Sequence, residues 1–145
     1  MIALDTNVLV YAHRADSSFH TRARDRVASL AQGAQLWAIP WPCIHEFLCI
    51  ATHSKIFKQP TPTAQAFEQV RAWMEAPNLR LLAEGDGYAE VLAPLLAKGH
   101  LKGPQIHDAR IAALCLYHSV TVLWSADRDF NRFPSLRVTN PLMDE

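Results

Sequence analysis

Short apolar runs alternate along this chain with longer segments in which apolar residues recur at helical spacing. A short run without polar alternation is typical of a strand that is buried on both faces, as in a parallel sheet. Strands that alternate with helices favour a central parallel sheet with helices on both sides. We therefore predict an α/β fold, a three-layer α/β/α sandwich with a central parallel sheet. Its strands are expected at MIAL, QLWAIP, LRLLA and VTVLW, with LRVTN as a candidate fifth.

The segments between these runs predict helices. Gly33, Pro77 and Gly99 mark helix ends, and Pro42 suits a first helical turn. No internal repeat, low-complexity tract or shift in composition divides the chain. Its 145 residues suit one domain with a sizeable core, so a single domain over residues 1–145 is expected. The helices are expected at residues 8–14, 18–31, 41–54, 63–76, 86–99 and 105–119.

Charge and cysteine content say more about the compartment than about the partner. Lys plus Arg equals Asp plus Glu, at 14 each, so the net charge neither requires nor excludes nucleic acid. Cys43, Cys49 and Cys115 lack CxxC spacing and stand among apolar residues, so we expect them to be reduced, buried and not zinc ligands. No signal-peptide pattern is visible, and no apolar run approaches the roughly 20 residues of a membrane span. A cytoplasmic protein without membrane contact is expected.

Four acidic residues stand where the predicted elements meet one edge of the sheet. Asp5 follows the first strand and Asp127 follows the fourth, and ligands bind outside the carboxyl ends of parallel strands. Glu46 and Asp108 lie within strongly apolar helices. Each has an ordinary interpretation when taken alone. Asp5 can cap a helix, Asp108 in a first helical turn suits the helix dipole, and Glu46 can be a solvated position on an amphipathic helix.

The set of four favours a metal centre over these separate interpretations. Carboxylates packed together repel one another, and burial pushes them towards protonation. A hard divalent cation such as Mg²⁺ or Mn²⁺ relieves both costs, because it prefers oxygen ligands and completes its shell with water and phosphate. Such a cation activates water and neutralises a leaving oxygen in phosphodiester hydrolysis. No Ser–His or Cys–His nucleophile pattern competes with this interpretation.

Four motifs in series resemble those of the PIN-domain ribonucleases, specifically the VapC-like toxins of prokaryotic toxin–antitoxin pairs. The motifs are LDTNVLVYA, IHEFL, IHDARIAAL and LWSADRDFNRF, and the resemblance covers nearly the whole chain. It implies a single PIN domain that cleaves transfer, ribosomal or messenger RNA and leaves a 5′-phosphate and a 3′-hydroxyl. It also implies a homodimer that a cognate VapB-like antitoxin neutralises.

The resemblance assigns roles residue by residue. Together the four acids would hold one or two Mg²⁺ or Mn²⁺ ions, with Glu46 as a ligand or as the group that orients the attacking water. Thr6 and Asn7 match small polar positions that steady the first acid. Ser125 stands where the family has Thr or Ser before the fourth acid. The four catalytic and metal-binding positions are Asp5, Glu46, Asp108 and Asp127.

The fourth predicted strand runs into two aspartates. Asp127 is nearer the strand end and matches the family's fourth acid, so we predict that it is the metal ligand. Asp129 is assigned a secondary role, as a supporting or alternate ligand or as the cap of the following turn. Replacing Asp127 with Ala should therefore cost more activity than replacing Asp129.

Basic residues near the predicted centre are candidate RNA contacts. Arg14 and Arg22 belong to a basic segment that is either a solvated helix face or a phosphate-binding rim. Lys98, Lys102 and His107 surround the loop that leads to Asp108, where contact with substrate is plausible.

Two other functions fit parts of the pattern. A haloacid-dehalogenase-type phosphatase also has an aspartate after its first strand, but it needs a second aspartate where this chain has Asn7. An amide cannot transfer the proton. A catalytically idle PIN-like module that binds RNA would be expected to lose acids, and this chain has all four. Metal-dependent degradation of RNA separates the enzyme from the module.

Overall fold

A five-stranded parallel sheet forms the centre of the protein. The computed structural model describes residues 1–143. The strands are β1 (Ile2–Leu4), β2 (Trp37–Pro40), β3 (Leu79–Leu82), β4 (Val122–Trp124) and β5 (Val138–Thr139). Their order is β3-β2-β1-β4-β5, and every neighbouring pair is parallel. The predicted fold class is confirmed, and the candidate fifth strand is present.

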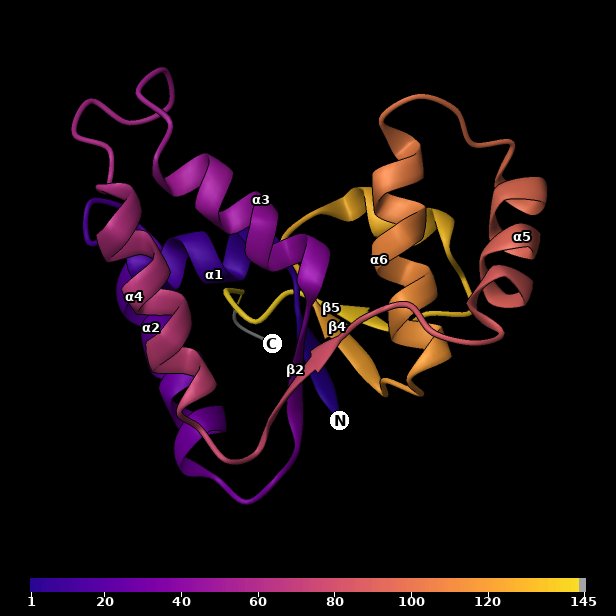
Figure 1. Cartoon of the computed structure of the whole chain (residues 1–145), viewed down its shortest axis with the longest axis horizontal. Coiled ribbons are helices and arrows are strands. Elements are labelled where there is room, and N and C mark those ends of the chain that lie inside the picture. Colours follow the sequence, from indigo (N-terminus) through magenta and orange to yellow (C-terminus); the bar gives the residue numbers. More distant parts are fainter. Residues whose placement is uncertain (144–145) are drawn as a thin grey trace.

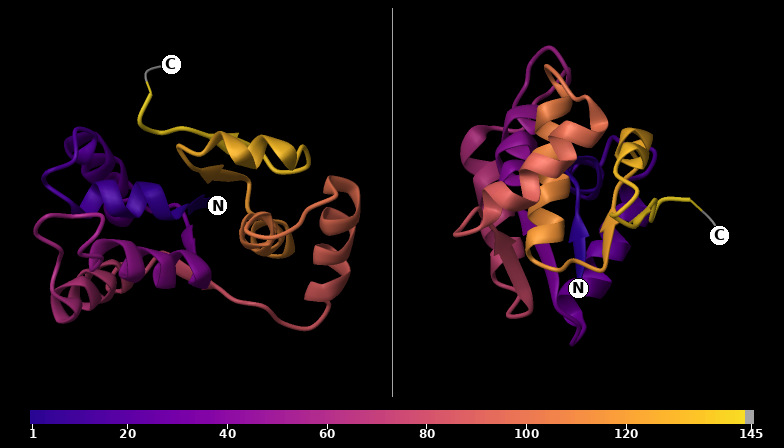
Figure 2. Two further views of the ribbon diagram at one scale, coloured as in Figure 1. Left: turned by 90° about the horizontal axis from the view of Figure 1, so that it is seen from above. Right: turned by 90° about the vertical axis from the view of Figure 1, so that its right-hand side faces the viewer.

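Helices cover both faces of this sheet. In Figures 1 and 2, α1 to α4 lie on one side, and α5 and α6 lie on the other. A 3₁₀ helix, η1, follows β4. No helix among residues 1–143 is long and apolar enough to cross a membrane. The bounds are α1 (Thr6–His13), α2 (His20–Gln32), α3 (Trp41–Ala51), α4 (Thr63–Met74), α5 (Tyr88–Gly99), α6 (Gln105–Tyr117) and η1 (Arg128–Arg132).

Local backbone chemistry sets the helix ends that the sequence placed only approximately. The helix expected to run to residue 54 ends at Ala51, because the backbone of Thr52 leaves the helical conformation (φ −95°, ψ 1°); its hydroxyl still donates to the Leu48 carbonyl at 2.7 Å. The helix expected from residue 86 begins after Gly87, whose φ of 81° is costly for other residues. The turn expected after Asp127 is the 3₁₀ helix η1.

Strand register places the first acid beside the fourth strand. β1 lies between β2 and β4, with Ile2 opposite Trp37 and Leu4 opposite Trp124. Ala3 and Leu4 point to opposite faces of the sheet and are both fully buried, so β1 is covered on both sides. The Asp5 N–H continues the ladder by donating to the Trp124 carbonyl at 2.9 Å. Asp5 therefore lies directly across from the β4 end.

The cysteines differ from the expectation at one position. Cys43 and Cys115 are buried free thiols, as predicted. Cys49 is also a free thiol, but it is exposed, so the prediction that all three are buried was wrong. Its helix, α3, turns Cys43, Ile44 and Phe47 into the core and leaves Cys49 on the opposite face.

Candidate active site

Asp5 is a buried carboxylate that caps a helix and lies at the bottom of the site. Its Oδ1 accepts a hydrogen bond from the Thr6 N–H at 2.8 Å, which caps α1. The Cys43 thiol donates to the same oxygen at 3.7 Å. Its Oδ2 accepts from the Ser125 hydroxyl at 2.6 Å and from the Asn7 amide at 3.3 Å. A carboxylate has about four acceptor positions, so its own surroundings hold Asp5 in one orientation.

Ser125 links this carboxylate to the turn after β4. Its Oγ accepts from the Asn7 amide at 3.3 Å and from the Asp127 N–H at 3.0 Å. The Asn7 Oδ1 accepts from the Ala126 N–H at 3.1 Å, which closes the network. Asn7 and Ser125 therefore lie beside the first acid, as predicted, and both donate hydrogen bonds to it. Thr6 contributes its backbone N–H to Asp5, and not its hydroxyl.

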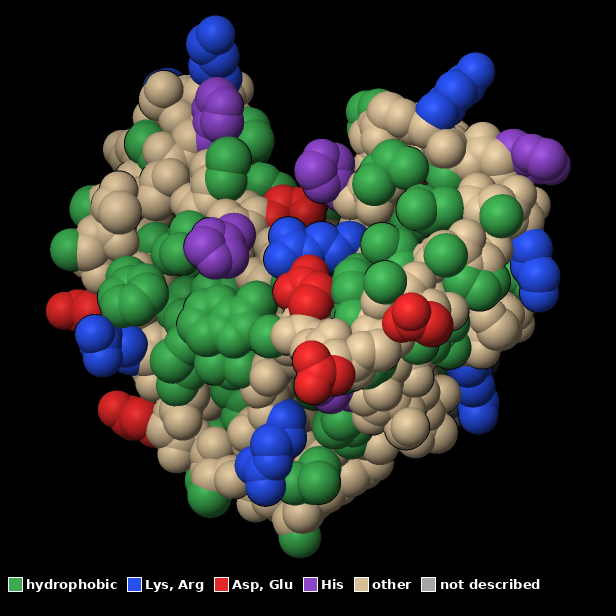
Figure 3. All heavy atoms as spheres, turned by 45° about the vertical axis from the view of Figure 1, so that its right-hand side comes forward, with side chains coloured by type: hydrophobic (Ala, Val, Ile, Leu, Met, Phe, Trp, Pro, Cys, Tyr) green, Lys and Arg blue, Asp and Glu red, His purple; other side chains and the backbone are tan. Residues whose placement is uncertain are grey.

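An open cleft of about 750 Å³ lies above this network, between α3, the start of α6 and η1. Figure 3 shows a notch between two lobes, with acidic, basic and histidine side chains gathered at its floor. Asp5 does not line the cleft, because it is buried beneath it with 5% of its surface exposed. The acids that line it are Glu46, Asp108, Asp127 and Asp129.

Three of these acids converge closely. Asp108, Asp127 and Asp129 each offer a carboxylate oxygen, and these oxygens lie within 4.8 Å of one another. Asp127 is fixed by its own contacts, since its Oδ1 caps η1 by accepting from the Asp129 N–H at 2.8 Å. Asp129, which the sequence placed in a secondary role, is thus part of the tightest acidic group among residues 1–143.

Several carboxyl groups in the cleft and beneath it have raised pKa values. Burial is the main cause of a raised pKa for Asp5, Glu46 and Asp108. Repulsion adds to it: Asp127 raises the pKa of Asp5, and both Asp127 and Asp5 raise that of Asp108. Asp5 and Asp108 act likewise on Glu46, although Glu46 is open to solvent. These carboxyl groups are electrostatically strained as anions.

The donor set fits a hard divalent cation. Every group in the convergent cluster is a carboxylate oxygen, the ligand type that Mg²⁺ and Mn²⁺ prefer. A cation would also relieve the repulsion that raises these pKa values. The Thr6 Oγ1 is buried below the cleft without a hydrogen bond of good geometry, yet it lies near enough to Glu46 to lower that pKa.

Arg132 is a cleft residue that the sequence interpretation missed. It lines the cleft, its Nε donates to the Asp129 carbonyl at 3.0 Å, and its guanidinium lies 3.7 Å from the Asp129 carboxylate. It lowers the pKa of Asp108, and its Nη1 is buried without a partner among the described residues. Its spacing of three residues from Asp129 could have indicated this position, because a 3₁₀ helix places residues three apart on the same side.

Comparisons with known proteins agree with this geometry. The PIN domain model matches residues 2–136. The chain belongs to the PIN domain family. Ribonuclease VapC43 of Mycobacterium tuberculosis is 35% identical over 142 residues, covering 98% of this chain and 96% of the relative. Ribonuclease VapC48 of the same organism is 30% identical over 141 residues, covering 94% of each.

Solved structures show the same fold. This PIN domain superposes on a chain of the Rickettsia felis VapBC2 complex, bound to a DNA fragment from its promoter, with a TM-score of 0.64. The two are 21% identical, and the match covers 97% of this chain and 98% of that one. Membership of the PIN family leaves no room for the haloacid-dehalogenase alternative.

The residues predicted to contact RNA lie at different places relative to the cleft. His107 lines the cleft, and Lys102 is exposed on the loop before it. Lys98 lines a separate groove between α5, α6 and residues 132–135. The Arg22 Nε donates to the Pro141 carbonyl at 3.4 Å. Their roles in RNA binding stay predictions.

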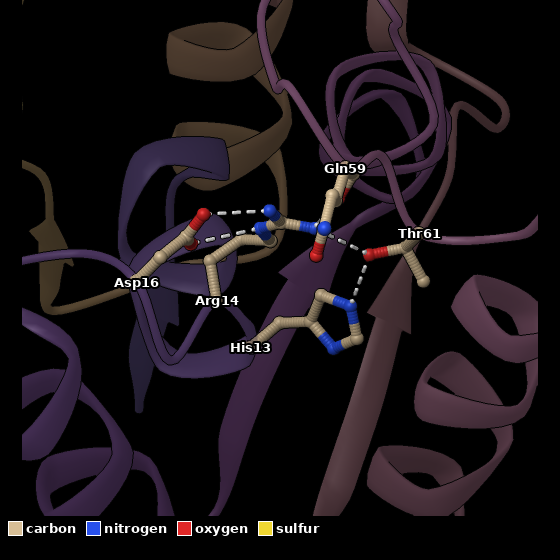
Figure 4. Close-up of polar contacts among 5 residues, drawn as sticks. All are labelled: His13, Arg14, Asp16, Gln59 and Thr61. Carbon is tan, nitrogen blue, oxygen red and sulfur yellow. Dashed lines mark hydrogen bonds and ion pairs between the residues drawn. The ribbon is translucent and has the colours of Figure 1, made fainter.

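Arg14 differs from the other four. Only 11% of its side chain is exposed, and it binds both Asp16 oxygens, at 3.0 and 2.7 Å. It also donates to the Gln59 carbonyl at 2.9 Å and to the Thr61 hydroxyl at 3.2 Å (Figure 4). This arrangement leaves little of the guanidinium for a phosphate. Arg14 holds the loop after α3 instead.

Proposed function

We propose that this PIN domain is a metal-dependent endoribonuclease toxin that hydrolyses RNA to 5′-phosphate and 3′-hydroxyl products. The observation that carries the proposal is the convergence of Asp108, Asp127 and Asp129 in an open cleft directly above buried Asp5. The similarity to proteins named VapC ribonucleases supports the same reaction.

The carboxylates of the cleft would hold the cofactor. Asp108 and Asp127 are the proposed direct ligands of one or two Mg²⁺ or Mn²⁺ ions, with Asp129 beside them. Such an ion lowers the pKa of water and neutralises charge on a leaving oxygen. Asp5 becomes a ligand only by giving up one of its present donors, so it either exchanges a contact or acts by holding the Ser125–Asp127 turn in place.

Two further side chains have proposed tasks around the phosphate. Glu46, whose pKa is raised by burial and by Asp5, opens onto the cleft and either binds the cation or orients the attacking water and takes its proton. Arg132 lines the cleft beside Asp129, where its guanidinium charge would stabilise a phosphate oxygen as negative charge develops there.

The partners are proposed from the relatives. The R. felis structure is described as VapBC2 bound to a promoter DNA fragment, and a Salmonella typhimurium structure as DNA-bound VapBC. We propose by analogy that this chain forms a homodimer, acts on RNA in the cytoplasm and is neutralised by a cognate VapB-like antitoxin. A small open reading frame found immediately upstream of the gene should restore growth when it is coexpressed, and its product should copurify with the chain.

The direct test is cleavage of RNA by the purified protein with Mg²⁺ or Mn²⁺. Cleavage should stop on chelation and resume when the cation is restored. Asp108→Asn is the cleanest inactive variant, because its carboxylate makes no hydrogen bond to the described residues. Asp5→Asn should also be inactive, but it places an amide donor among groups that already donate. Absence of cleavage with either cation, together with normal growth on expression, would contradict the proposal.

A further inference from the structure

We propose that two basic loops on opposite walls of the acidic cleft bind the RNA strand on both sides of the cleaved phosphate. The first is the α3–α4 loop, residues 52–62, and the second is the α5–α6 loop, residues 100–104. The inference rests on the proposed ribonuclease function and adds how the substrate is held. It assigns Lys55, Lys58 and Lys102 to phosphate contacts.

The α3–α4 loop extends one wall of the cleft. Glu46 and Cys49 of α3 line the cleft, and the loop begins three residues after Cys49. Lys55 and Lys58 are exposed, and neither side chain pairs with an acid within residues 1–143. Figure 1 shows this loop above α3, and Figure 3 shows a basic side chain at the tip of that lobe.

The α5–α6 loop extends the opposite wall. It leads into α6, whose first turns supply Gln105, His107 and Asp108 to the cleft lining. Lys102 is exposed, and its backbone N–H donates to the Gln105 Oε1 at 3.3 Å. In Figure 3 the second lobe also carries a basic side chain at its tip, across the notch from the first. Lysines therefore flank the acidic floor from two directions.

The α3–α4 loop is held in place and not left to move freely. The Thr61 hydroxyl is hydrogen-bonded to the His13 Nε2 at 3.0 Å and accepts a hydrogen bond from the Arg14 guanidinium at 3.2 Å (Figure 4). The Arg14 guanidinium also lies over the Phe57 ring, 4.0 Å from its centroid. These contacts fix both the middle and the end of the loop. Arg14 is thus a positioning residue for Lys55 and Lys58.

The charge distribution explains why the protein needs the two basic loops, which form the rims of the cleft. The acidic floor repels a polyanion, even when a cation there offsets part of the charge. Lysines on both rims supply the sequence-independent attraction that phosphates contribute to nucleic-acid affinity. A small phosphodiester reaches only the floor, whereas an RNA strand reaches both rims. Rim lysines should therefore affect RNA binding and leave hydrolysis of a small ester unchanged.

The experiment measures RNA affinity and small-ester hydrolysis in parallel. The probe is a fluorescent, mixed-sequence single-stranded RNA, titrated in chelator so that it is not cleaved. Lys55→Ala/Lys58→Ala should weaken binding roughly ten-fold, and Lys102→Ala about three-fold. The slope of log affinity against log salt should fall by about 0.7 for each phosphate that the variant no longer neutralises. Hydrolysis of bis(p-nitrophenyl) phosphate with Mn²⁺ should stay at the wild-type rate.

Control variants separate the rims from general charge and from folding. Arg26→Ala removes an exposed positive charge on α2, which does not line the cleft, and should bind RNA as the wild type does. Arg14→Ala should weaken RNA binding and speed tryptic cleavage after Lys55 and Lys58. Arg14→Lys should restore neither fully, because Lys lacks the forked contacts to Asp16 and Thr61.

The outcomes distinguish this inference from the proposed function. If the rim variants bind RNA as tightly as Arg26→Ala, the two-rim model is overturned even though RNA cleavage by the wild type still supports the nuclease. If the rim variants lose affinity but the wild type cleaves no RNA, the ribonuclease proposal fails and the binding surface stands. If small-ester hydrolysis falls with RNA binding, the lysines act on the centre itself and the inference fails.

Discussion

At the scale of single residues, Asp127 and Asp129 have different surroundings despite sharing one acidic group. Asp127 is anchored through its N–H to Ser125 and through its Oδ1 to the Asp129 N–H. It also raises the pKa of both Asp5 and Asp108. The Asp129 side chain is 63% exposed and lies beside Arg132. Asp127 is the better-positioned ligand.

We therefore expect Asp127→Ala to lower RNA cleavage by at least about 100-fold and Asp129→Ala by about ten-fold. Because Asp127 also caps η1, part of the first loss could come from the helix. Asp127→Asn is the control, since Asn keeps the cap and removes the charge. It should be as inactive as Asp127→Ala. Initial rates on one RNA decide the order, and a larger loss at Asp129 would contradict the ranking.

Cys49 gives a second prediction at this scale. It is exposed on the cleft wall, whereas burial raises the pKa of Cys43 well above its ordinary value and that of Cys115 to about 12. An aromatic disulfide reagent should therefore modify one thiol in the native protein and all three after denaturation. The adduct at Cys49 should block RNA cleavage, and Cys49→Ser should resist the block. Modification of the buried thiols at the same rate would be inconsistent with this structure.

The sequence predicts the location of a side chain best where its position on a helix or strand determines that location. Asp127 follows a strand and Asp108 begins a helix, so sheet topology alone brings them to one edge. The bond between Asp5 and Ser125 spans 120 residues, and no local pattern encodes it. From the sequence, Asp5 is either the cap of a helix or part of the metal site. In the structure its Oδ1 caps α1 and its Oδ2 binds Ser125 beneath the cleft. The inclusion of Asp129 likewise depends on the tight turn of η1.

At the scale of elements, Asn78 joins the end of α2 to the strands that follow. Its amide donates to the carbonyls of Leu30, Gly33 and Gln35 at 2.8 to 3.0 Å. Its Oδ1 accepts from the Trp37 indole at 3.2 Å. With 8% of its surface exposed, Asn78 is buried against one carbonyl in the last turn of α2 and two carbonyls in the turn that follows. The element order was predictable from apolar periodicity, but this junction was not, because its partners lie more than 40 residues away.

Asn78→Asp should reduce the free energy of unfolding by about 2–4 kcal/mol. The carboxylate has the same shape but replaces two N–H donors with an acceptor that faces three carbonyl oxygens. Gln35→Glu is the matched control, because it makes the same chemical change in an exposed side chain of the α2–β2 turn that Asn78 binds. It should shift the free energy by no more than about 0.5 kcal/mol. Urea unfolding measures both, and equal effects would contradict the role of Asn78.

At the scale of the whole molecule, equal numbers of acidic and basic residues conceal an uneven distribution. Four acids, Glu46, Asp108, Asp127 and Asp129, line the cleft, where Arg110 and Arg132 are the only Lys or Arg residues among the described lining, although the whole chain has 14 of each sign. Composition could not predict this distribution, because folding decides which charges become neighbours. Its cost is visible in the raised pKa values of Asp5, Glu46 and Asp108, which make the metal-free protein dependent on pH.

The sign of that dependence follows from linkage. Each of these acids binds its proton more tightly in the folded state than in the unfolded state, where the pKa is 3.8 for Asp and 4.5 for Glu. Their contribution to stability is fully present below the unfolded values and is lost as pH rises through the raised folded values. Asp16 and Glu84, whose pKa values Arg14 and Arg110 lower, act oppositely and only in more acidic solution.

The melting temperature of the protein in chelator should therefore fall as pH rises from about 4.5 to 7. Adding Mg²⁺ or Mn²⁺ at pH 7 should raise it, because the cation binds the folded protein and offsets the carboxylate repulsion. Asp108→Asn isolates the effect, since it removes one charge of the cluster. Its profile in chelator should be flatter, and its shift with cation smaller, than those of the wild type. A wild-type melting temperature that rises across this range in chelator, with no difference from Asp108→Asn, would show that the cleft acids do not repel one another.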